Sequence, residues 1–250
     1  MEQKKVISVD LDNTLIQTSY DYTRAYDMLI DYLQELGVEA TREQISEDID
    51  TVDYEMLNEW GLPMERFPNA FVRVAESHLD MTEEQRERVE HFGYSAYRNQ
   101  GEYAIRGFMD GADQMLRRLN GVSDKLVITT VGDPRVQNPK IRALDLESRV
   151  DDVFVVPYNT SSSKKSKEFA FDKIRESVGT GSVLWHVGDS ESSDIEAAVN
   201  SGFNAVRVGE QDDWLTKNGD TADEYAREVL RYNSASEFVR NFEEFVPRLY

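Results

Sequence analysis

Five short apolar runs limit most strongly what this chain can fold into. Each run is rich in Val, Ile and Leu, and the stretches between them carry apolar residues at helical spacing. Strands that are buried on both faces give such unbroken runs, and they alternate with helices when the strands are parallel. The sequence therefore predicts an α/β fold with a doubly wound parallel sheet, whose strands are residues 6–9, 126–129, 153–156, 183–187 and 205–208. A sixth short strand at 229–232 and a terminal helix are also expected.

The first two predicted strands are separated by a long segment of a different kind. Residues 17–106 show helical periodicity and no strand-like alternation. Capping-box patterns begin at Thr41 and Thr82, and Gly37 closes an earlier apolar stripe. A crossover between neighbouring parallel strands needs far fewer residues. We therefore expect residues 1–16 and 107–250 to form the α/β domain and residues 17–106 to form an inserted all-helical domain.

Charge and composition exclude several classes of protein. The 250 residues include 48 acidic and 28 basic side chains, so the net charge of −20 disfavours binding to nucleic acid or an anionic membrane. The chain has no cysteine, which excludes disulfides, thiolate metal sites and cysteine nucleophiles. It shows no membrane-length apolar run and no signal-peptide pattern, so we expect a cytoplasmic protein. The acidity is typical of an ordinary acidic protein or of one adapted to concentrated salt, which screens self-repulsion.

Pairs of carboxylates follow two of the predicted strands. Asp10 and Asp12 come directly after the first strand, and Asp189 and Asp194 follow the fourth. Ligands of open parallel sheets bind beyond the carboxyl ends of the strands. Two carboxylates there can supply a nucleophile or metal ligand and a general acid/base. The other Asp-x-Asp pattern, at residues 48–50, lies on a predicted helix, and we assign it no function.

A hydroxyl group and a group of lysines follow the other two core strands. The second strand ends in Thr129 and Thr130, either of which could bind a phosphate oxygen, although threonine is also common at a strand end. Lys164, Lys165 and Lys167 follow the third strand. An anionic substrate beside several carboxylates needs such a cation, but lysines also suit the solvated start of a helix. Carboxylate oxygens without nearby His or Cys favour Mg²⁺ as the metal.

With these motifs in this order, the chain resembles the haloacid dehalogenase (HAD) superfamily of phosphohydrolases. Its first motif, Asp-x-Asp-x-Thr, is matched by Asp10, Asp12 and Thr14, and its fourth, Gly-Asp-x-x-x-x-Asp, by Gly188, Asp189 and Asp194. Thr130 fits the second motif, a strand ending in Ser or Thr, although Val131 stands where Asn is usual. The third motif is a lysine at a helix start. No proline fixes its register, so we rank Lys165 first with Lys164 close behind. Lys140 ranks lower, since it lies in the predicted helix after the second motif.

This resemblance implies a Rossmann-like, HAD-type core with the inserted helices as a cap, and it implies a role for each matched residue. Asp10 is the nucleophile that forms an aspartyl-phosphate, and Asp12 is the general acid/base. Thr130 and Lys165 or Lys164 hold the phosphoryl oxygens. The implied cofactor is Mg²⁺, and the implied partner is a small phosphorylated molecule. The implied Mg²⁺ ligands are Asp10, the backbone carbonyl of Asp12, Asp189 and Asp194.

Two features favour a phosphatase within this superfamily. Its dehalogenases lack a carboxylate at the position of Asp12, and its phosphonate-cleaving members use a cap lysine. Here no lysine occurs between Lys5 and Lys125. A phosphosugar mutase and a catalytically silent relative that binds a phosphorylated ligand remain as alternatives. The sequence does not rank the arginines that could bind a second anionic group of the substrate, which are Arg24, Arg66, Arg73, Arg98 and Arg106.

Overall fold

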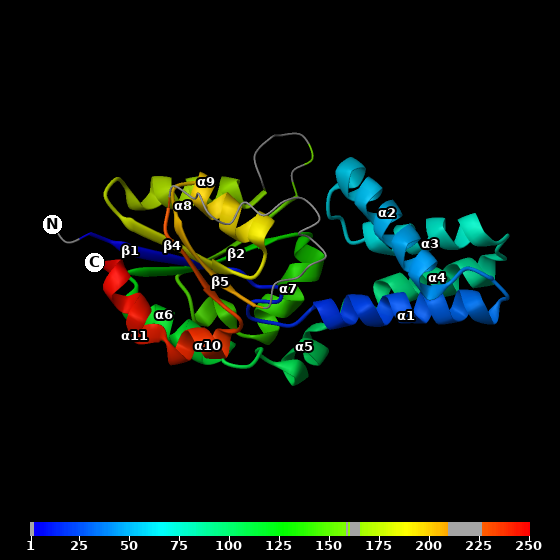
Figure 1. Ribbon diagram of the computed structural model, residues 1–250, viewed down its shortest axis with the longest axis horizontal. Helices are drawn as coiled ribbons and strands as arrows, with labels where there is room; N and C mark the ends of the chain where they lie inside the picture. The colour runs from blue at the N-terminus through cyan, green and yellow to red at the C-terminus, as the bar shows by residue number, and fades with distance from the viewer. Residues whose placement is uncertain (1–2, 159, 161–165, 210–226) are drawn as a thin grey trace.

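Two lobes make up the protein (Figure 1). The computed structural model describes residues 3–158, 160, 166–209 and 227–250. One lobe is built around a sheet, and the other contains only helices. Within the described part of the chain, none of the helices combines the length and the apolar character that crossing a membrane would require.

In the described part of the chain, the sheet lobe contains six parallel strands in the order β3-β2-β1-β4-β5-β6. This is the Rossmann strand order, in which the chain changes direction between β1 and β4. The fold class predicted from the apolar runs is confirmed, and so is the sixth strand. The strands are β1 (Lys5–Val9), β2 (Lys125–Val131), β3 (Asp152–Val156), β4 (Val183–Gly188), β5 (Asn204–Val208) and β6 (Val229–Tyr232).

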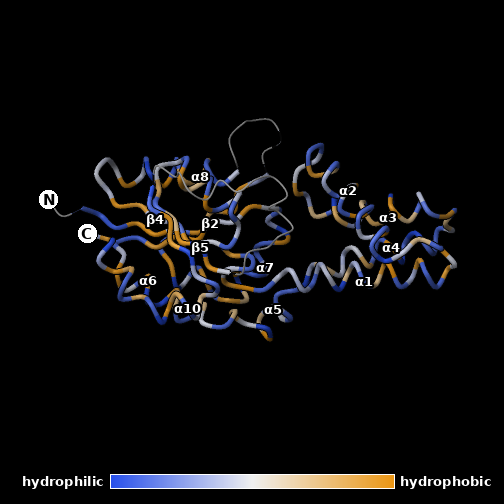
Figure 2. The backbone as a smooth tube through the Cα atoms, in the orientation of Figure 1, coloured by the Kyte–Doolittle hydropathy of each residue, from blue (hydrophilic) through white to orange (hydrophobic). Residues whose placement is uncertain are grey.

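Helices cover both faces of this sheet, because successive strand residues point to opposite sides. Ile7 and Trp185 pack on one face among α6, α7, α10 and α11, whereas Val6 and Phe171 lie on the other with α8 and α9. The strands form the apolar centre of the lobe (Figure 2). The helices of this lobe are α5 (Gln100–Arg106), α6 (Ala112–Val122), α7 (Pro134–Ala143), α8 (Ser166–Val178), α9 (Ala197–Asn200), α10 (Ala235–Arg240) and α11 (Phe242–Phe245). A π-helical segment, η2 (Glu191–Glu196), precedes α9, and 3-10 turns span Leu146–Ser148 and Val246–Leu249.

Four helices with their own apolar core form the helical lobe. They are α1 (Ser19–Glu35), α2 (Arg42–Trp60), α3 (Arg66–His78) and α4 (Glu83–Tyr94). Thr41 and Thr82 form the two expected capping boxes at the starts of α2 and α4. Gly37, with φ of 89°, takes the left-handed conformation just beyond the end of α1. The division of the chain at residues 17 and 106 stays a prediction.

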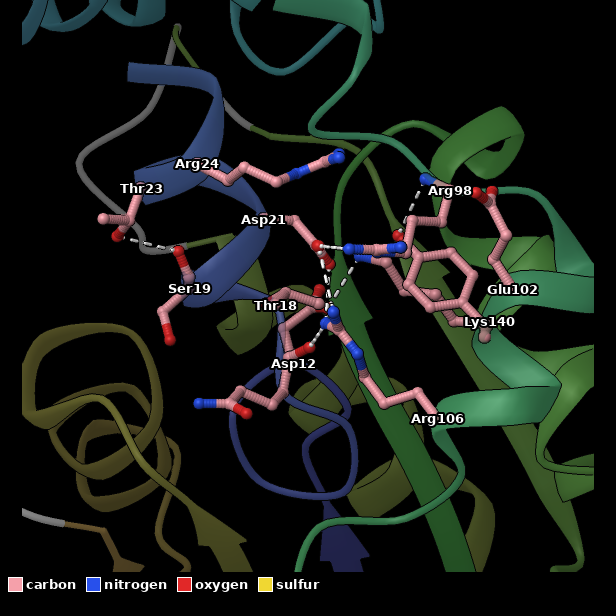
Figure 3. Close-up of polar contacts among 12 residues, drawn as sticks. Asp12, Thr18, Ser19, Asp21, Thr23, Arg24, Arg98, Glu102, Arg106 and Lys140 are labelled. Carbon is pink, nitrogen blue, oxygen red and sulfur yellow. Dashed lines mark hydrogen bonds and ion pairs between the residues drawn. The ribbon is translucent and has the colours of Figure 1, made fainter. Parts of the chain in front are cut away.

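A buried ion-pair cluster joins the two connections between the lobes. Asp21 on α1 is fully buried, and its carboxylate accepts hydrogen bonds from Arg98 Nε at 2.6 Å and Arg106 Nη1 at 2.7 Å. The first connection leads into α1, and the second contains Arg98 and runs through α5 to Arg106. Figure 3 shows the two guanidinium groups converging on Asp21. Tyr103 of α5 packs in the apolar core of the sheet lobe, so α5 is anchored there.

The two ends of the described chain lie together at the edge of the sheet where β1 begins, away from the helical lobe (Figure 1). The Nζ atom of Lys5 lies 3.6 Å from the centre of the Tyr250 ring. The carboxyl ends of the parallel strands point the opposite way, toward the junction between the lobes.

Candidate active site

The loop after β1 places the first two carboxylates at the switch point of the sheet. The backbone N–H of Asp10 donates to the Val187 carbonyl at 2.8 Å, which ties the end of β1 to β4. Asn13 then adopts φ of 54°, a left-handed conformation that Asn tolerates better than most residues. Its side-chain oxygen accepts from the backbone N–H groups of Thr18 and Ser19, both at 3.0 Å. The loop is therefore held to the sheet on one side and to the start of α1 on the other.

Asp10 is buried against a lysine. The Nζ atom of Lys167, at the start of α8, contacts both Asp10 Oδ1 and Asp194 Oδ1. Burial raises the pKa of Asp10 well above its usual value, although Lys167 opposes this. Burial also opposes the charge on Lys167, but the two carboxylates outweigh it and raise the pKa of the ammonium group. Lys167 thus stays cationic beside Asp10.

Asp194 receives three donors at the start of η2. Besides Lys167, His186 contacts it through Nε2 at 2.8 Å and the backbone N–H of Ser190 donates at 3.0 Å. Burial favours the neutral carboxyl, but Lys167 and His186 outweigh it and lower the pKa of Asp194. A Cβ atom on Gly188 would lie 2.3 Å from the Asp194 carboxyl carbon, so this position of the Gly-Asp motif must be glycine.

The carboxylates of Asp10 and Asp194, which are buried, and of Asp189, which is partly buried, form one cluster. Each offers a carboxylate oxygen, and these oxygens lie within 4.8 Å of one another. Burial first, and then the neighbouring Asp194 carboxylate, raise the pKa of Asp189 to about 7. Three oxygen donors whose charges repel one another fit a hard divalent cation such as Mg²⁺, which would offset the repulsion. Thr14, 3.3 Å from Asp10 Oδ2 and 3.3 Å from Asp189 Oδ1, supports this cluster.

The two threonines at the end of β2 are distinguished by their contacts. Thr129 is fully buried, and its hydroxyl lies 2.8 Å from the Ser8 hydroxyl. Among the residues that the structure describes, Thr130 has no side-chain hydrogen-bond partner. Neighbouring strand residues point to opposite faces of the sheet, so the side chains of Thr129 and Thr130 point in different directions. The Thr129 hydroxyl is used in the buried contact with Ser8. Thr130 remains the candidate for a phosphate contact.

Asp12 is not part of this carboxylate cluster, and its side chain contacts α7. Its Oδ1 atom lies 2.7 Å from Lys140 Nζ, and its Oδ2 atom accepts from Gln137 Nε2 at 2.8 Å. The Asp12 side chain remains 27% exposed. Its carboxylate is therefore held at one side and open at the other.

The open side of Asp12 faces a cavity between the lobes. The cavity has a volume of about 190 Å³. The sheet lobe contributes Asp12 and Gln137 to its lining, and the helical lobe contributes Tyr22, Arg66 and Tyr97. The rings of Tyr22 and Tyr97 meet edge to face with centroids 6.2 Å apart.

Polar contacts join the two lobes beside this cavity, at Asp133 in its lining. Asp133, which caps α7, accepts from the backbone N–H of Met64 at 2.9 Å. Arg135 donates to Glu65 through Nη1 and Nη2, and it also contacts Asp133. Arg135 outweighs burial and lowers the pKa of Asp133 to about 2, so this contact keeps its charge at neutral pH.

The structure brings together most of the side chains expected from the sequence, with a different lysine beside Asp10. Lys164 and Lys165 lie outside the described residues, whereas Lys167 contacts Asp10. Lys140, ranked low as the phosphate-binding lysine, contacts Asp12 instead. Gln137 was missed entirely. The spacing of Gln137 and Lys140 on one helix face was the available signal, but nothing in the sequence pointed that face toward Asp12.

The parallel sheet, the buried carboxylate cluster at its switch point and the helical lobe beside it define a HAD-type α/β hydrolase. The chain belongs to the haloacid dehalogenase-like hydrolase family, whose model matches residues 4–202. No curated protein matches the sequence.

Solved structures show the same fold at low sequence identity. A haloacid dehalogenase-like family hydrolase from Xanthomonas campestris aligns with a TM-score of 0.70 and 16% identity, over 100% of this chain and 99% of that one. YfnB from Bacillus subtilis, named as a HAD-hydrolase and bound to magnesium, aligns with a TM-score of 0.57 and 16% identity over 99% of both chains. L-2-haloacid dehalogenase from Xanthobacter autotrophicus aligns with a TM-score of 0.58 and 14% identity, over 96% of this chain and 99% of that one. At these identities the likeness concerns the fold alone.

Proposed function

We propose that this protein is a Mg²⁺-dependent phosphatase that hydrolyses a small phosphomonoester through an aspartyl-phosphate on Asp10. One observation carries the proposal. A buried carboxylate, Asp10, lies against the ammonium group of Lys167, while a second carboxylate, Asp12, faces the cavity between the lobes. A nucleophile beside a cation and a separate acid/base are what phosphomonoester hydrolysis requires. A dehalogenase has no comparable use for Asp12, because a halide leaves without a proton.

The proposed reaction has two displacements at phosphorus. An oxygen of Asp10 attacks phosphorus, the bond to the leaving oxygen breaks, and Asp12 gives that oxygen its proton. Asp12, now a carboxylate, takes a proton from water as the water attacks phosphorus. The bond between phosphorus and Asp10 then breaks, and phosphate leaves. Lys167 and the Thr130 hydroxyl hold the phosphoryl oxygens in this scheme.

Asp10, Asp189, Asp194 and the backbone carbonyl of Asp12 would hold the Mg²⁺ ion. The ion would neutralise charge between the phosphoryl group and the carboxylates. The helical lobe would cover Asp12 as a cap and limit the access of water to the reacting phosphoryl group.

The size of the cavity and its one cation define a substrate class. About 190 Å³ corresponds to roughly six water-sized groups, at about 30 Å³ each. Arg66 is the single cationic residue among the described residues that line it. Arg66 Nη1 forms an ion pair with Asp53, while Arg66 Nε has no hydrogen-bond partner in the described part of the chain. Of the other candidate arginines, three are engaged by Ser95 or Asp21 and the fourth does not line the cavity; they are Arg24, Arg98 and Arg106, and Arg73. This leaves Arg66 to bind a small leaving group that carries a carboxylate.

Replacing Arg66 should change substrate preference. We expect Arg66→Met to lower kcat/KM by about 10- to 100-fold for a phosphomonoester whose leaving group carries a carboxylate. An ester of similar size with a neutral leaving group should lose less than about threefold, since it makes no ion pair. Arg73→Met is the matched control, because Arg73 is exposed on the same helix. Equal losses on both esters would contradict this role for Arg66.

Phosphate release tests the proposed function directly. A panel of phosphomonoesters with a chromogenic aryl phosphate should release phosphate with Mg²⁺ and none with EDTA, in dilute buffer or in molar KCl. A phosphosugar mutase would turn over substrate without releasing phosphate. A silent relative would show only a ligand-dependent rise in Tm. Halide release from a 2-haloacid, without phosphate release, would refute the proposal.

A further inference from the structure

A second buried lysine in the sheet lobe contacts the proposed acid/base. Lys140 is 2% exposed and lies on α7, with its Nζ atom 2.7 Å from Asp12 Oδ1. Gln137, one turn earlier and 4% exposed, donates to the other oxygen, Oδ2, at 2.8 Å. A buried ammonium group is costly unless it is paired. The buried Lys140 ammonium group therefore depends on Asp12 as its charged partner.

Lys140 and Gln137 are themselves fixed, and we call the pair the α7 clamp. Lys140 Nζ donates to Gln137 Oε1 at 2.9 Å, and Gln137 Nε2 donates to the Val131 carbonyl at 2.9 Å. A Cβ atom on Gly132 would lie 2.9 Å from Gln137 Nε2, so glycine leaves room for this amide. The clamp is thus anchored to the end of β2.

The clamp leaves Asp12 free to work on one side. A carboxylate has about four lone-pair sites, two on each oxygen. Lys140 occupies one site on Oδ1 and Gln137 one on Oδ2, so each oxygen keeps another. Asp12 and Gln137 both line the cavity between the lobes, where the leaving group would lie.

We propose that Lys140 and Gln137 are positioning residues that fix the Asp12 carboxyl group against the leaving oxygen of the substrate. This inference rests on the proposed phosphatase function. Lys167 serves the nucleophile, and Lys140 serves the acid/base, so the two lysines have separate tasks.

The clamp also contacts the second connection between the lobes. Lys140 Nζ lies 5.9 Å from the centre of the Tyr103 ring on α5, and the Tyr103 hydroxyl accepts from the Arg98 backbone N–H at 3.4 Å. Figure 3 shows Lys140 and Asp12 beside the ion pairs that Arg98 and Arg106 make with Asp21. The side chain that holds Asp12 is therefore packed against the chain segment that leads to the cap.

The dependence on the leaving group tests the clamp. The parameter kcat/KM covers the steps up to departure of the leaving group, so it excludes the later work of Asp12 on water. We expect Lys140→Met to lower kcat/KM about 100-fold for an alkyl phosphate, whose leaving oxygen needs a proton from a well-placed acid. For 4-nitrophenyl phosphate the loss should stay below about fivefold, because the nitrophenolate leaves without a proton.

Two further variants complete the test. Gln137→Leu removes one donor without changing charge, and it should show the same selective loss on alkyl esters; it decides the matter alone if Lys140→Met does not fold. The control variant Lys173→Met, at an exposed lysine of α8, should leave kcat/KM unchanged for both the alkyl and the aryl phosphate. Equal losses on alkyl and aryl esters, or no loss, would overturn the clamp while leaving the phosphatase intact. A wild-type protein that releases no phosphate would instead remove the proposed function.

Discussion

Asp10→Asn should lower the rate of phosphate release by roughly 10⁴-fold or more, because it removes the proposed nucleophile. Asn keeps the shape of the side chain, and Lys167 keeps its contact with Asp194, so the fold should survive. The measurement is kcat on the best substrate of the panel, with Tm and circular dichroism recorded for each protein.

Asp48→Asn is the matched control for this variant. Asp48 is the first carboxylate of the other Asp-x-Asp pattern, and it lies on α2 with its side chain 48% exposed. This control should keep full activity. A folded Asp10→Asn protein that retained more than about one hundredth of the wild-type rate would place the nucleophile elsewhere.

Asp21→Asn should destabilise the protein more than any surface change of charge. Asp21 is fully buried, and it is the partner of two arginines whose side chains are only 19% and 23% exposed. Removing one partner of a buried ion pair typically costs about 3–5 kcal/mol, because the other charge stays behind. At about 2–4 °C per kcal/mol for a chain of this size, Tm should fall by roughly 10 °C.

Asp27→Asn provides the comparison on the same helix. Asp27 also pairs with an arginine, Arg42, but the two side chains are 53% and 44% exposed. Exposed pairs of this kind contribute about 0–1 kcal/mol, so Tm should change little. Calorimetry of both variants at the same ionic strength checks the difference. Equal changes in Tm would mean that Asp21 does not hold the two connections together.

The parts of the fold that sequence predicted well are those with a local cause. Each predicted strand is found, since an unbroken run such as 183–187 has no other place than a sheet buried on both faces. The capping boxes at Thr41 and Thr82 are likewise set by residues three positions apart. Asp10 and Asp189 meet because parallel strands end at one edge of the sheet, which the order of the motifs already implied.

The parts that sequence missed depend on the phase of a helix or on a distant partner. Lys167 contacts Asp10 because α8 begins at Ser166, and no residue in the preceding lysine group marks that start. Lys140 and Gln137 share one face of α7, but the packing of that helix beside the loop after β1 brings them to Asp12. The five candidate arginines could also be ranked only from their contacts in the folded structure. Asp21 occupies two of them, and the cavity contains one.

The position of the chain ends has a practical consequence. Lys5 and Tyr250 are neighbours at the edge of the sheet farthest from the helical lobe. A tag, a fused reporter or a linker to a solid support at either end would therefore stand behind the sheet, with the cavity turned toward the solution. The protein could therefore be tethered by both ends at once to a single anchor, with the helical lobe pointing away from it.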